Sequence, residues 1–249
     1  MKLRRLFVIA VLVATPAMAG VIGDYRAVQS VSVGGGSLQV LEDARLTPAL
    51  ARKLWKTAVD PIFVLGEDNP AARPFKAKPL VPARLRQITA KGDIAVDVVP
   101  DEQAPLARIE TRRLGSTSLP VYLITTDNDA GFGSYSGRAT TLYAVRDGVL
   151  KAVLATGDNG KAEPVALVST LKSGWRIVDA RPSHTVIEQI LCRPDFRHGQ
   201  TDQNPQFLVS YLTYWSDGHA WRIAKRVISG FWEGDEDWPA TSQFPKPAA

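Results

Sequence analysis

The pattern in this sequence that best suits a metal ion is the run 127–131 (Asp-Asn-Asp-Ala-Gly). Carboxylate and amide oxygens crowded into one tight loop are the ligands that Ca²⁺ takes. Asp127 and Asp129 fill the first and third positions of an EF-hand loop, but Arg138 stands at the twelfth, where a glutamate is expected. The alternative is a turn built from Asp, Asn and Gly. The sequence therefore offers Ca²⁺ as a candidate ligand of Asp127 and Asp129, and it indicates no other cofactor.

A glycine-rich loop follows directly at 131–137 (GFGSYSG). Its glycines allow the backbone to approach a ligand closely, and Ser134, Tyr135 and Ser136 supply hydroxyl groups that can hydrogen-bond to one. The loop is not a nucleophile elbow, because its central residue is tyrosine, and it is not a P-loop, because no Gly-Lys-Ser/Thr follows. We predict that these three residues belong to a ligand-binding surface. The alternative is a purely conformational role for the glycines.

Two tryptophans, Trp232 and Trp238, bracket the acidic run 233–237 (EGDED). Indole rings beside carboxylates can bind sugars, peptides or cations by stacking and by charge. We predict Trp232 and Trp238 as ligand-binding residues, with closure of one end of a β domain as the alternative. The same carboxylates are candidates for glycoside hydrolysis, although a catalytic pair normally flanks its substrate from different elements.

Two further features carry little chemistry on their own. Ser169 and Lys172 match the S-x-x-K motif of penicillin-binding proteins, but that motif requires a serine at the start of a helix, and 169–172 is predicted to be strand and turn. Cys192 is the only cysteine, which excludes an internal disulfide. Its apolar neighbours favour a buried thiol, with a mixed or intermolecular disulfide as the alternative.

The N-terminal residues have the layout of a secretory signal peptide. Lys2, Arg4 and Arg5 precede the apolar run 6–14, and small residues stand at positions 17 and 19. The run is too short to span a bilayer of about 30 Å. We expect cleavage between Ala19 and Gly20, a periplasmic or secreted protein, and no membrane span in the mature chain.

Charge excludes one large class of partner. The chain of 249 residues has 30 basic and 25 acidic side chains, a net charge of +5. Removing the three basic residues of the leader leaves 27 against 25, or +2. We therefore expect no nucleic-acid partner, since such binding depends on a marked excess of positive charge.

One segment predicts a helix, at about 48–59. Thr47 suits the N-cap, Pro48 suits the first helical position, and apolar residues then recur at intervals of three and four. A second helix is predicted at 185–192, where Glu188 would complete a capping box, but a buried strand fits these residues almost as well. The last residues, 244–249, are expected to be a frayed tail.

The dipeptides Asp147-Gly148 and Asp217-Gly218 each stand between two strand-like runs and predict two-residue hairpin turns. Such turns set the pairing of the strands, and in both hairpins they place apolar residues on a common face. The first turn pairs Val145 with Leu150, Tyr143 with Ala152, and Thr141 with Leu154. The second pairs Tyr214 with Trp221, Leu212 with Ile223, and Leu208 with Val227.

Strand-like segments greatly outnumber helices and recur at short spacing. They are predicted at 26–33, 37–41, 62–65, 83–89, 94–99, 119–125, 163–172 and 175–180. This pattern is typical of a mainly β fold, an antiparallel sandwich or barrel-like sheet of hairpins with one packed α-helix. We predict one domain over 20–249, with a possible weak subdivision near 105–118.

The sequence resembles no family closely enough to name one. We expect a non-enzymatic β domain of the cell envelope that binds a ligand or partner, either an envelope protein or a glycan. The alternatives are an extracytoplasmic polysaccharide or peptidoglycan hydrolase that uses carboxylates and a purely structural envelope component.

Overall fold

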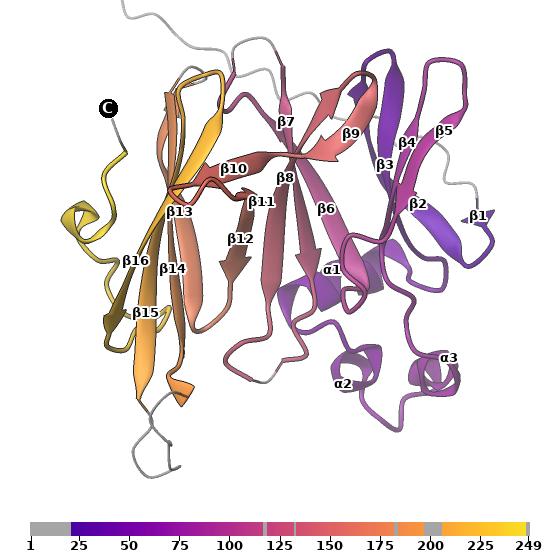
Figure 1. Ribbon diagram of the computed structural model, residues 1–249. Helices are drawn as coiled ribbons and strands as arrows, with labels where there is room; N and C mark the ends of the chain where they lie inside the picture. Colours follow the sequence, from indigo (N-terminus) through magenta and orange to yellow (C-terminus); the bar gives the residue numbers. More distant parts are fainter. Residues whose placement is uncertain (1–20, 117–118, 132, 182–183, 197–205, 248–249) are drawn as a thin grey trace, which may run out of the picture.

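The computed structural model describes residues 21–116, 119–131, 133–181, 184–196 and 206–247. Three sheets follow one another across the molecule, and a small group of helices lies at the lower end of the first (Figure 1). The prediction of a mainly β, largely antiparallel fold with a small helical part is confirmed. The predicted leader and its cleavage site lie outside the described residues. Within those residues, no helix combines the length and the apolar character that crossing a membrane requires.

The N-terminal sheet has the strand order β1-β2-β3-β4-β5, and every neighbouring pair is antiparallel. Its strands are β1 (Val21–Ile22), β2 (Tyr25–Val33), β3 (Gly36–Asp43), β4 (Arg84–Ile88) and β5 (Ile94–Val98). The helices lie between β3 and β4. They are α1 (Pro48–Lys56), α2 (Pro61–Leu65), the 3₁₀ turn η1 (Pro70–Ala72) and α3 (Arg73–Ala77).

Helix α1 begins as the sequence predicts. The Thr47 side chain accepts a hydrogen bond from the backbone N–H of Leu50, and Pro48 occupies the first turn. The predicted strand at 62–65 is wrong, because α2 covers those residues. The Asp60 carboxylate accepts from the backbone N–H of Ile62 at 2.8 Å, so that Asp60 and Pro61 start a helix of their own.

The central sheet has the order β12-β8-β7-β6, and β9 also pairs with β8. Its strands are β6 (Leu106–Arg112), β7 (Val121–Asp127), β8 (Arg138–Arg146), β9 (Val149–Ala152) and β12 (Ala166–Ser169). Strand β6 was not predicted, and it occupies part of 105–118, where the sequence suggests a weak subdivision. One face of this sheet packs on the N-terminal sheet and the other on the C-terminal sheet.

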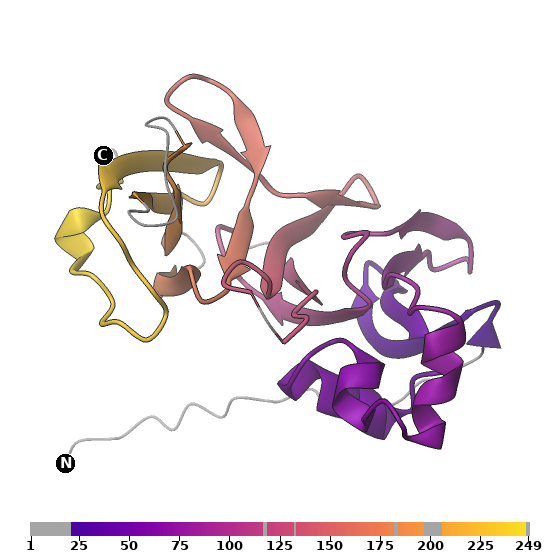
Figure 2. The ribbon, with the colours of Figure 1, turned by 90° about the horizontal axis from the view of Figure 1, so that it is seen from below.

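The C-terminal sheet has the order β11-β10-β16-β15-β14-β13. Its strands are β10 (Leu154–Gly157), β11 (Ala162–Pro164), β13 (Ser173–Arg181), β14 (His184–Pro194), β15 (Phe207–Ser216) and β16 (Trp221–Ser229). After β16 the chain runs over the outer face of this sheet and makes the 3₁₀ turn η3 (Thr241–Gln243) (Figures 1 and 2). Of the predicted frayed tail, Phe244 is instead buried, and its ring stacks on Trp238.

The first predicted hairpin is confirmed at its turn. Asp147 and Gly148 both have positive φ, and Val145 faces Leu150. The predicted pairing of Thr141 with Leu154 is wrong, because Thr141 faces Ala166 of β12 instead. Strand β9 ends at Ala152, and β12 replaces it along the rest of the same edge of β8.

The second predicted hairpin has the wrong register. Tyr214 faces Ile223 and Ser216 faces Trp221, so the strands are joined by the longer loop 217–220. The cause is local, because the Asp217 carboxylate accepts from the backbone N–H groups of His219 and Ala220. A slip of two residues keeps the same side chains on the same face, so the predicted apolar face is retained.

The segment 185–192 forms part of strand β14, the alternative that its sequence leaves open. It pairs along its length with both β13 and β15. Glu188 caps no helix. Its carboxylate is buried and accepts from Arg176 Nε at 2.8 Å, which neutralises the charge inside the sheet.

Side chains of the neighbouring sheets, rather than further strands, bond the open edges of the central sheet. Gln29 of β2 bonds both backbone groups of Ile109 in β6, and Glu42 of β3 accepts from Ala107 N at 3.3 Å. In the same way, Gln87 of β4 bonds the main chain at β9, and Gln189 of β14 bonds the main chain of β12. Each side chain satisfies edge groups that packing would otherwise leave unbonded.

Candidate functional site

Three segments that are distant in sequence meet at the lower end of the molecule (Figure 1). They are the loop 128–137, the turn 170–172 between β12 and β13, and the segment 230–238 after β16. Lys172 N donates to Ser134 O at 3.2 Å, and Gly234 N donates to Leu171 O at 2.8 Å. The turn therefore lies between the glycine-rich loop and the acidic segment, two features that the sequence presented separately.

Lys172 is the centre of this junction. Only 6% of the residue is exposed, and its ammonium group forms an ion pair with the Glu233 carboxylate. The same nitrogen lies 3.6 Å from the centroid of the Phe231 ring and 5.5 Å from that of Phe207. A buried ammonium group needs such compensation, which the carboxylate and the negative faces of the rings provide together. The arrangement fixes the turn and the acidic segment against each other.

Exposed apolar side chains lie on the segments that meet at this junction and on the elements next to them. We call this surface the aromatic end, and its residues are Phe63 (64% exposed), Tyr135 (51%), Leu171 (59%), Phe196 (79%) and Phe231 (47%). Phe63 of α2 belongs to it because its ring adjoins Gly131 of the same loop that carries Tyr135. Exposed apolar residues are ordinary when scattered, whereas several that come from neighbouring segments make this end a candidate interaction surface.

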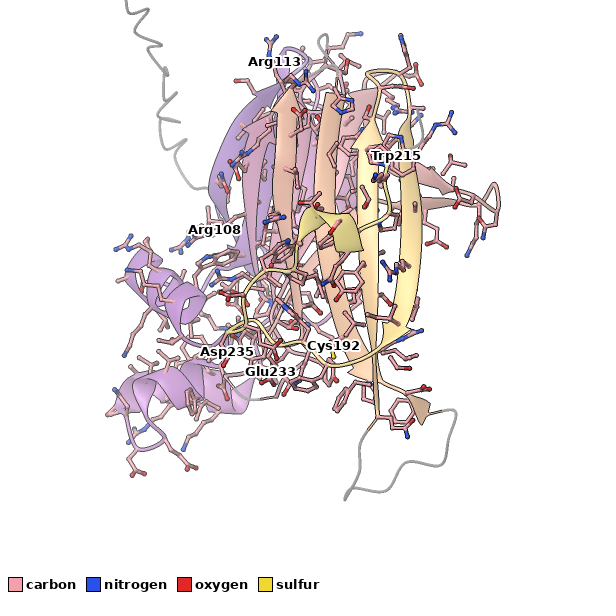
Figure 3. All side chains as sticks on the ribbon, turned by 90° about the vertical axis from the view of Figure 1, so that its left-hand side faces the viewer. Arg108, Arg113, Cys192, Trp215, Glu233 and Asp235 are labelled. Atoms are coloured by element: carbon pink, nitrogen blue, oxygen red, sulfur yellow. The ribbon has the colours of Figure 1, made fainter. Side chains whose placement is uncertain are left out.

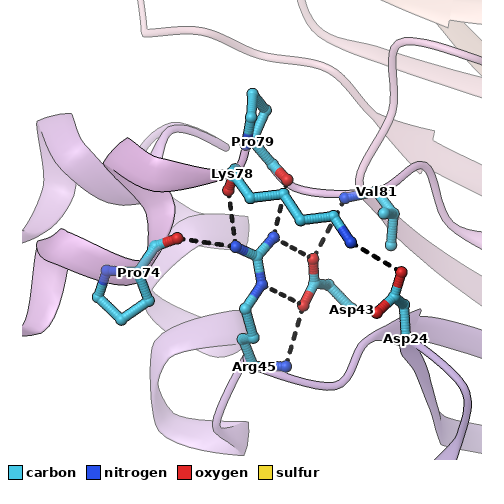
Figure 4. A network of polar contacts seen from close by, with 7 residues as sticks. All are labelled: Asp24, Asp43, Arg45, Pro74, Lys78, Pro79 and Val81. Carbon is cyan, nitrogen blue, oxygen red and sulfur yellow. Dashed lines mark hydrogen bonds and ion pairs between the residues drawn. The ribbon is translucent and has the colours of Figure 1, made fainter.

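The acidic segment follows closely on Phe231 of the aromatic end, and Figure 3 labels Glu233 and Asp235 at the lower end of the molecule. Glu233 is neutralised by Lys172, whereas Asp235, Glu236 and Asp237 are exposed. Among the described residues, no Lys, Arg or His side chain forms an ion pair with these three carboxylates. This border of the surface is therefore negatively charged.

The predicted residues of the glycine-rich loop take different positions. The Tyr135 side chain is half exposed, and its partial burial, together with the nearby charge of Glu233, raises the pKa of its phenol above the ordinary value. Ser134 holds the turn through its carbonyl group, and the Ser136 hydroxyl donates to Gly133 O at 3.1 Å. Of the three predicted residues, Tyr135 offers the largest exposed side chain.

Of the two predicted tryptophans, Trp232 lies beneath the surface and Trp238 is partly buried. Trp232 is 5% exposed and meets Trp238 edge to face, with the ring centroids 5.9 Å apart. Trp238 Nε1 donates to the buried Glu188 carboxylate at 3.2 Å. A Cβ on Gly174 would lie 3.1 Å from both rings, so the indoles pack directly on the backbone of β13. This geometry matches the alternative interpretation, in which they close one end of a β domain.

The proposed calcium ligands are engaged within the protein. The Asp127 carboxylate is buried and accepts from Arg138 Nε at 2.9 Å and from Asp129 N at 3.0 Å. Asp129 Oδ1 accepts from Gly131 N at 2.8 Å, as in an Asx turn. Within the described part of the chain, no three His, Cys, Asp or Glu side chains come together in a way that would hold a metal ion.

The expectation for Cys192 is confirmed in one respect, since the thiol is buried and unpaired. Burial raises the pKa of the thiol above its ordinary value. Cys192 N also donates to Lys172 O at 2.8 Å, so the cysteine backbone supports the turn.

Sequence reasoning missed most of the aromatic end. In the sequence, Leu171 and Lys172 stand out only within an S-x-x-K match, and the run 62–65 that contains Phe63 predicts a strand. A usable signal existed at Phe231, which stands next to Trp232 and the acidic run. Comparison with protein-family models, with curated proteins and with solved structures found no match to this chain.

Proposed function

We propose that this chain is an exported, non-enzymatic protein that binds another protein of the cell envelope through its aromatic end. The observation that carries the proposal is the group of exposed apolar side chains at the end of the molecule where buried Lys172 pairs with the partly exposed Glu233. Binding surfaces have an apolar centre and a polar rim, and their anchors are held by a rigid support. Here the ion pair and the tryptophan layer beneath it supply that support.

The identity of the exposed side chains favours a protein partner over a glycan. Sugars stack mainly on tryptophan and tyrosine rings with polar groups alongside, but of these rings only Tyr135 is well exposed here, since Trp232 is buried and Trp238 is partly covered. The exposed groups are chiefly phenyl rings and Leu171, which match the apolar side chains of a protein. The charge of Asp235, Glu236 and Asp237 favours a partner that carries Lys or Arg beside its apolar anchor.

Two matched peptides test this chemistry. Both have the same Leu-Phe core, and one carries Lys and the other Glu on each side. We expect the Lys-flanked peptide to bind the purified protein, measured by fluorescence anisotropy, and its affinity to fall as salt is raised. Leu171→Glu should abolish the binding, and Ile94→Glu should not. Ile94 is equally exposed but belongs to the β4–β5 hairpin, which turns at the upper end of Figure 1.

Photo-crosslinking in the cells that make the protein supplies the functional test. A benzophenone side chain at position 135 should give a protein adduct that Leu171→Glu removes, while the same group at position 94 should give none. Equal binding of the Glu-flanked peptide, or adducts indifferent to Leu171→Glu, would reject the proposal.

A further inference from the structure

Strand β16 has an open edge over its lower half. On one side it pairs with β15 along its whole length, from Trp221 to Ser229. On the other side β10 pairs with it in parallel, but only from Trp221 to Ile223. Figure 3 shows β16 at the border of the sheet, with β10 and β11 projecting beside its upper half.

The hydrogen-bond pattern identifies which backbone groups are open. Gly230 N donates to Phe207 O, so Gly230 and every second residue before it in β16 bond to β15. Cys192 N donates to Lys172 O, on the side of β14 away from β15, and the strand registers give the same alternation. In an antiparallel pair, every second residue turns its N–H and C=O groups away from the partner strand. On β16 these residues are Trp221 and Ile223, which face β10, and then Lys225, Val227 and Ser229. Within the described residues, no backbone or side-chain group bonds the main chain of these last three.

We propose that this edge accepts an extended acidic segment of a partner protein as an added strand. Three successive outward residues offer a ladder of main-chain donors and acceptors, which gives such additions their affinity. The protein already uses the same edge in this way, since β10 occupies it immediately above. Side chains on one face of an added strand would lie beside Lys225 and those on the other face beside Arg226, so a carboxylate on either face meets a cation.

Charge also selects between possible occupants. Lys225 and Arg226 are exposed, and neither forms an ion pair with a described carboxylate. A second copy of this chain on the same edge would bring two sets of these cations together, with Arg222 of each copy added. Like charges on neighbouring strands are unfavourable. An acidic strand of another protein lacks this penalty.

The test uses a short capped peptide that alternates Glu and Val, and its matched control in which Lys replaces Glu. We expect the Glu peptide to bind the purified protein and the Lys peptide not to bind, measured by backbone NMR shifts confined to β16 and β10. Methylating the peptide nitrogens on the edge that faces β16 should weaken binding at least about tenfold, and methylating the opposite edge should have little effect. These probes leave the protein unchanged.

Variants of the protein complete the test. Val227→Pro removes one outward N–H that has no partner, a change that edge strands tolerate, and should weaken binding about tenfold. Val227→Thr should bind as the parent does, and so should Leu171→Glu, which separates this site from the aromatic end. Binding of both peptides alike, or insensitivity to methylation on either edge, would overturn the proposal. A dimer in sedimentation that Val227→Pro dissociates would identify a second copy as the occupant and would also overturn it.

Discussion

Gln87 and Leu150 join two sheets through a side chain that takes the place of a strand. Leu150 N donates to Gln87 Oε1 at 2.8 Å, and Gln87 Nε2 donates to Gly148 O at 2.7 Å. Gln87 is 3% exposed and Leu150 is 6% exposed, so water has little access to these groups. The amide therefore satisfies an N–H of β9 and the C=O of Gly148 in the turn just before it, as a neighbouring strand would.

Gln87→Leu keeps the approximate size of the side chain and removes both hydrogen bonds. The buried N–H of Leu150 is then left without a partner, while Gly148 O at the turn can bond to water. We expect the free energy of unfolding to fall by about 1–3 kcal/mol, measured by urea denaturation. Gln103→Leu at an exposed site should change it by less than about 0.5 kcal/mol. Equal effects of the two changes would refute this role of the amide.

Glu42 makes stability depend on pH. Burial raises the pKa of its carboxyl from 4.5 to about 7, against the smaller opposing effects of the hydrogen bond from Ala107 and of the nearby Arg108 and Arg26 charges. Because the folded state binds the proton more tightly, this group stabilises the fold most below pH 4.5. That contribution is lost as the pH rises towards about 7. The loss is on the order of 3 kcal/mol.

Glu42→Gln should remove this dependence, because an amide can accept from Ala107 N without a charge to bury. We expect the variant to exceed the parent in free energy of unfolding by an amount that is small near pH 4.5 and grows up to pH 8. Urea denaturation across this range measures it. Parallel curves for the two proteins would show that the Glu42 carboxyl keeps its ordinary pKa.

The Lys172–Glu233 pair predicts unequal costs for its two partners. The Lys172 side chain is 7% exposed, whereas the Glu233 side chain is 37% exposed. Glu233→Ala leaves a buried ammonium group without a carboxylate and should lower the free energy of unfolding by about 2–3 kcal/mol. Lys172→Met keeps the packing against Phe231 and leaves a carboxylate that water can reach, so it should cost about 1 kcal/mol or less. The reverse order would contradict this account, and the double variant measures the coupling between them.

Gly137 is where the glycine-rich loop meets the β12–β13 turn. Its φ is +154°, and a Cβ there would lie 2.4 Å from the carbonyl oxygen of Ser169. Gly137→Ala should therefore lower the free energy of unfolding by about 2–3 kcal/mol, because the backbone must move. Gly133→Ala in the same loop has 3.8 Å of clearance and should cost about 1 kcal/mol from its positive φ alone. Thermal denaturation measures the loss of stability in each variant. Equal losses would show that the backbone at Gly137 can move away from Ser169 at little cost.

Local chemistry explains which parts of the fold could be predicted. The turn at Asp147-Gly148 and the start of α1 at Thr47 depend on residues adjacent in sequence, and both were found. The predicted two-residue turn after Ser216 is wrong because the Asp217 carboxylate accepts from N–H groups two and three residues ahead. These bonds lengthen the loop without altering the apolar pattern of the strands. A pattern with period two fixes the buried face but does not detect a slip of two residues.

The candidate site was harder to predict because its parts come from distant segments. Tyr135 was identified from its own loop, but its neighbourhood depends on Lys172, whose burial follows from contacts with Phe207, Phe231 and Glu233. The same limit applies to Gln29, whose partner lies 80 residues away. No local spacing reports such a contact, and an isolated lysine or glutamine reads as a surface residue.

On its other side, the loop 128–137 also contacts the segment between helices α1 and α2. Val59 N donates to Asp129 O at 2.6 Å, while Lys172 N reaches Ser134 O in the same loop. The loop 128–137 is therefore hydrogen-bonded both to the helical region near the N-terminus and to the turn before β13. Because one loop makes both contacts, its conformation sets the position of the turn 170–172 relative to the helical region.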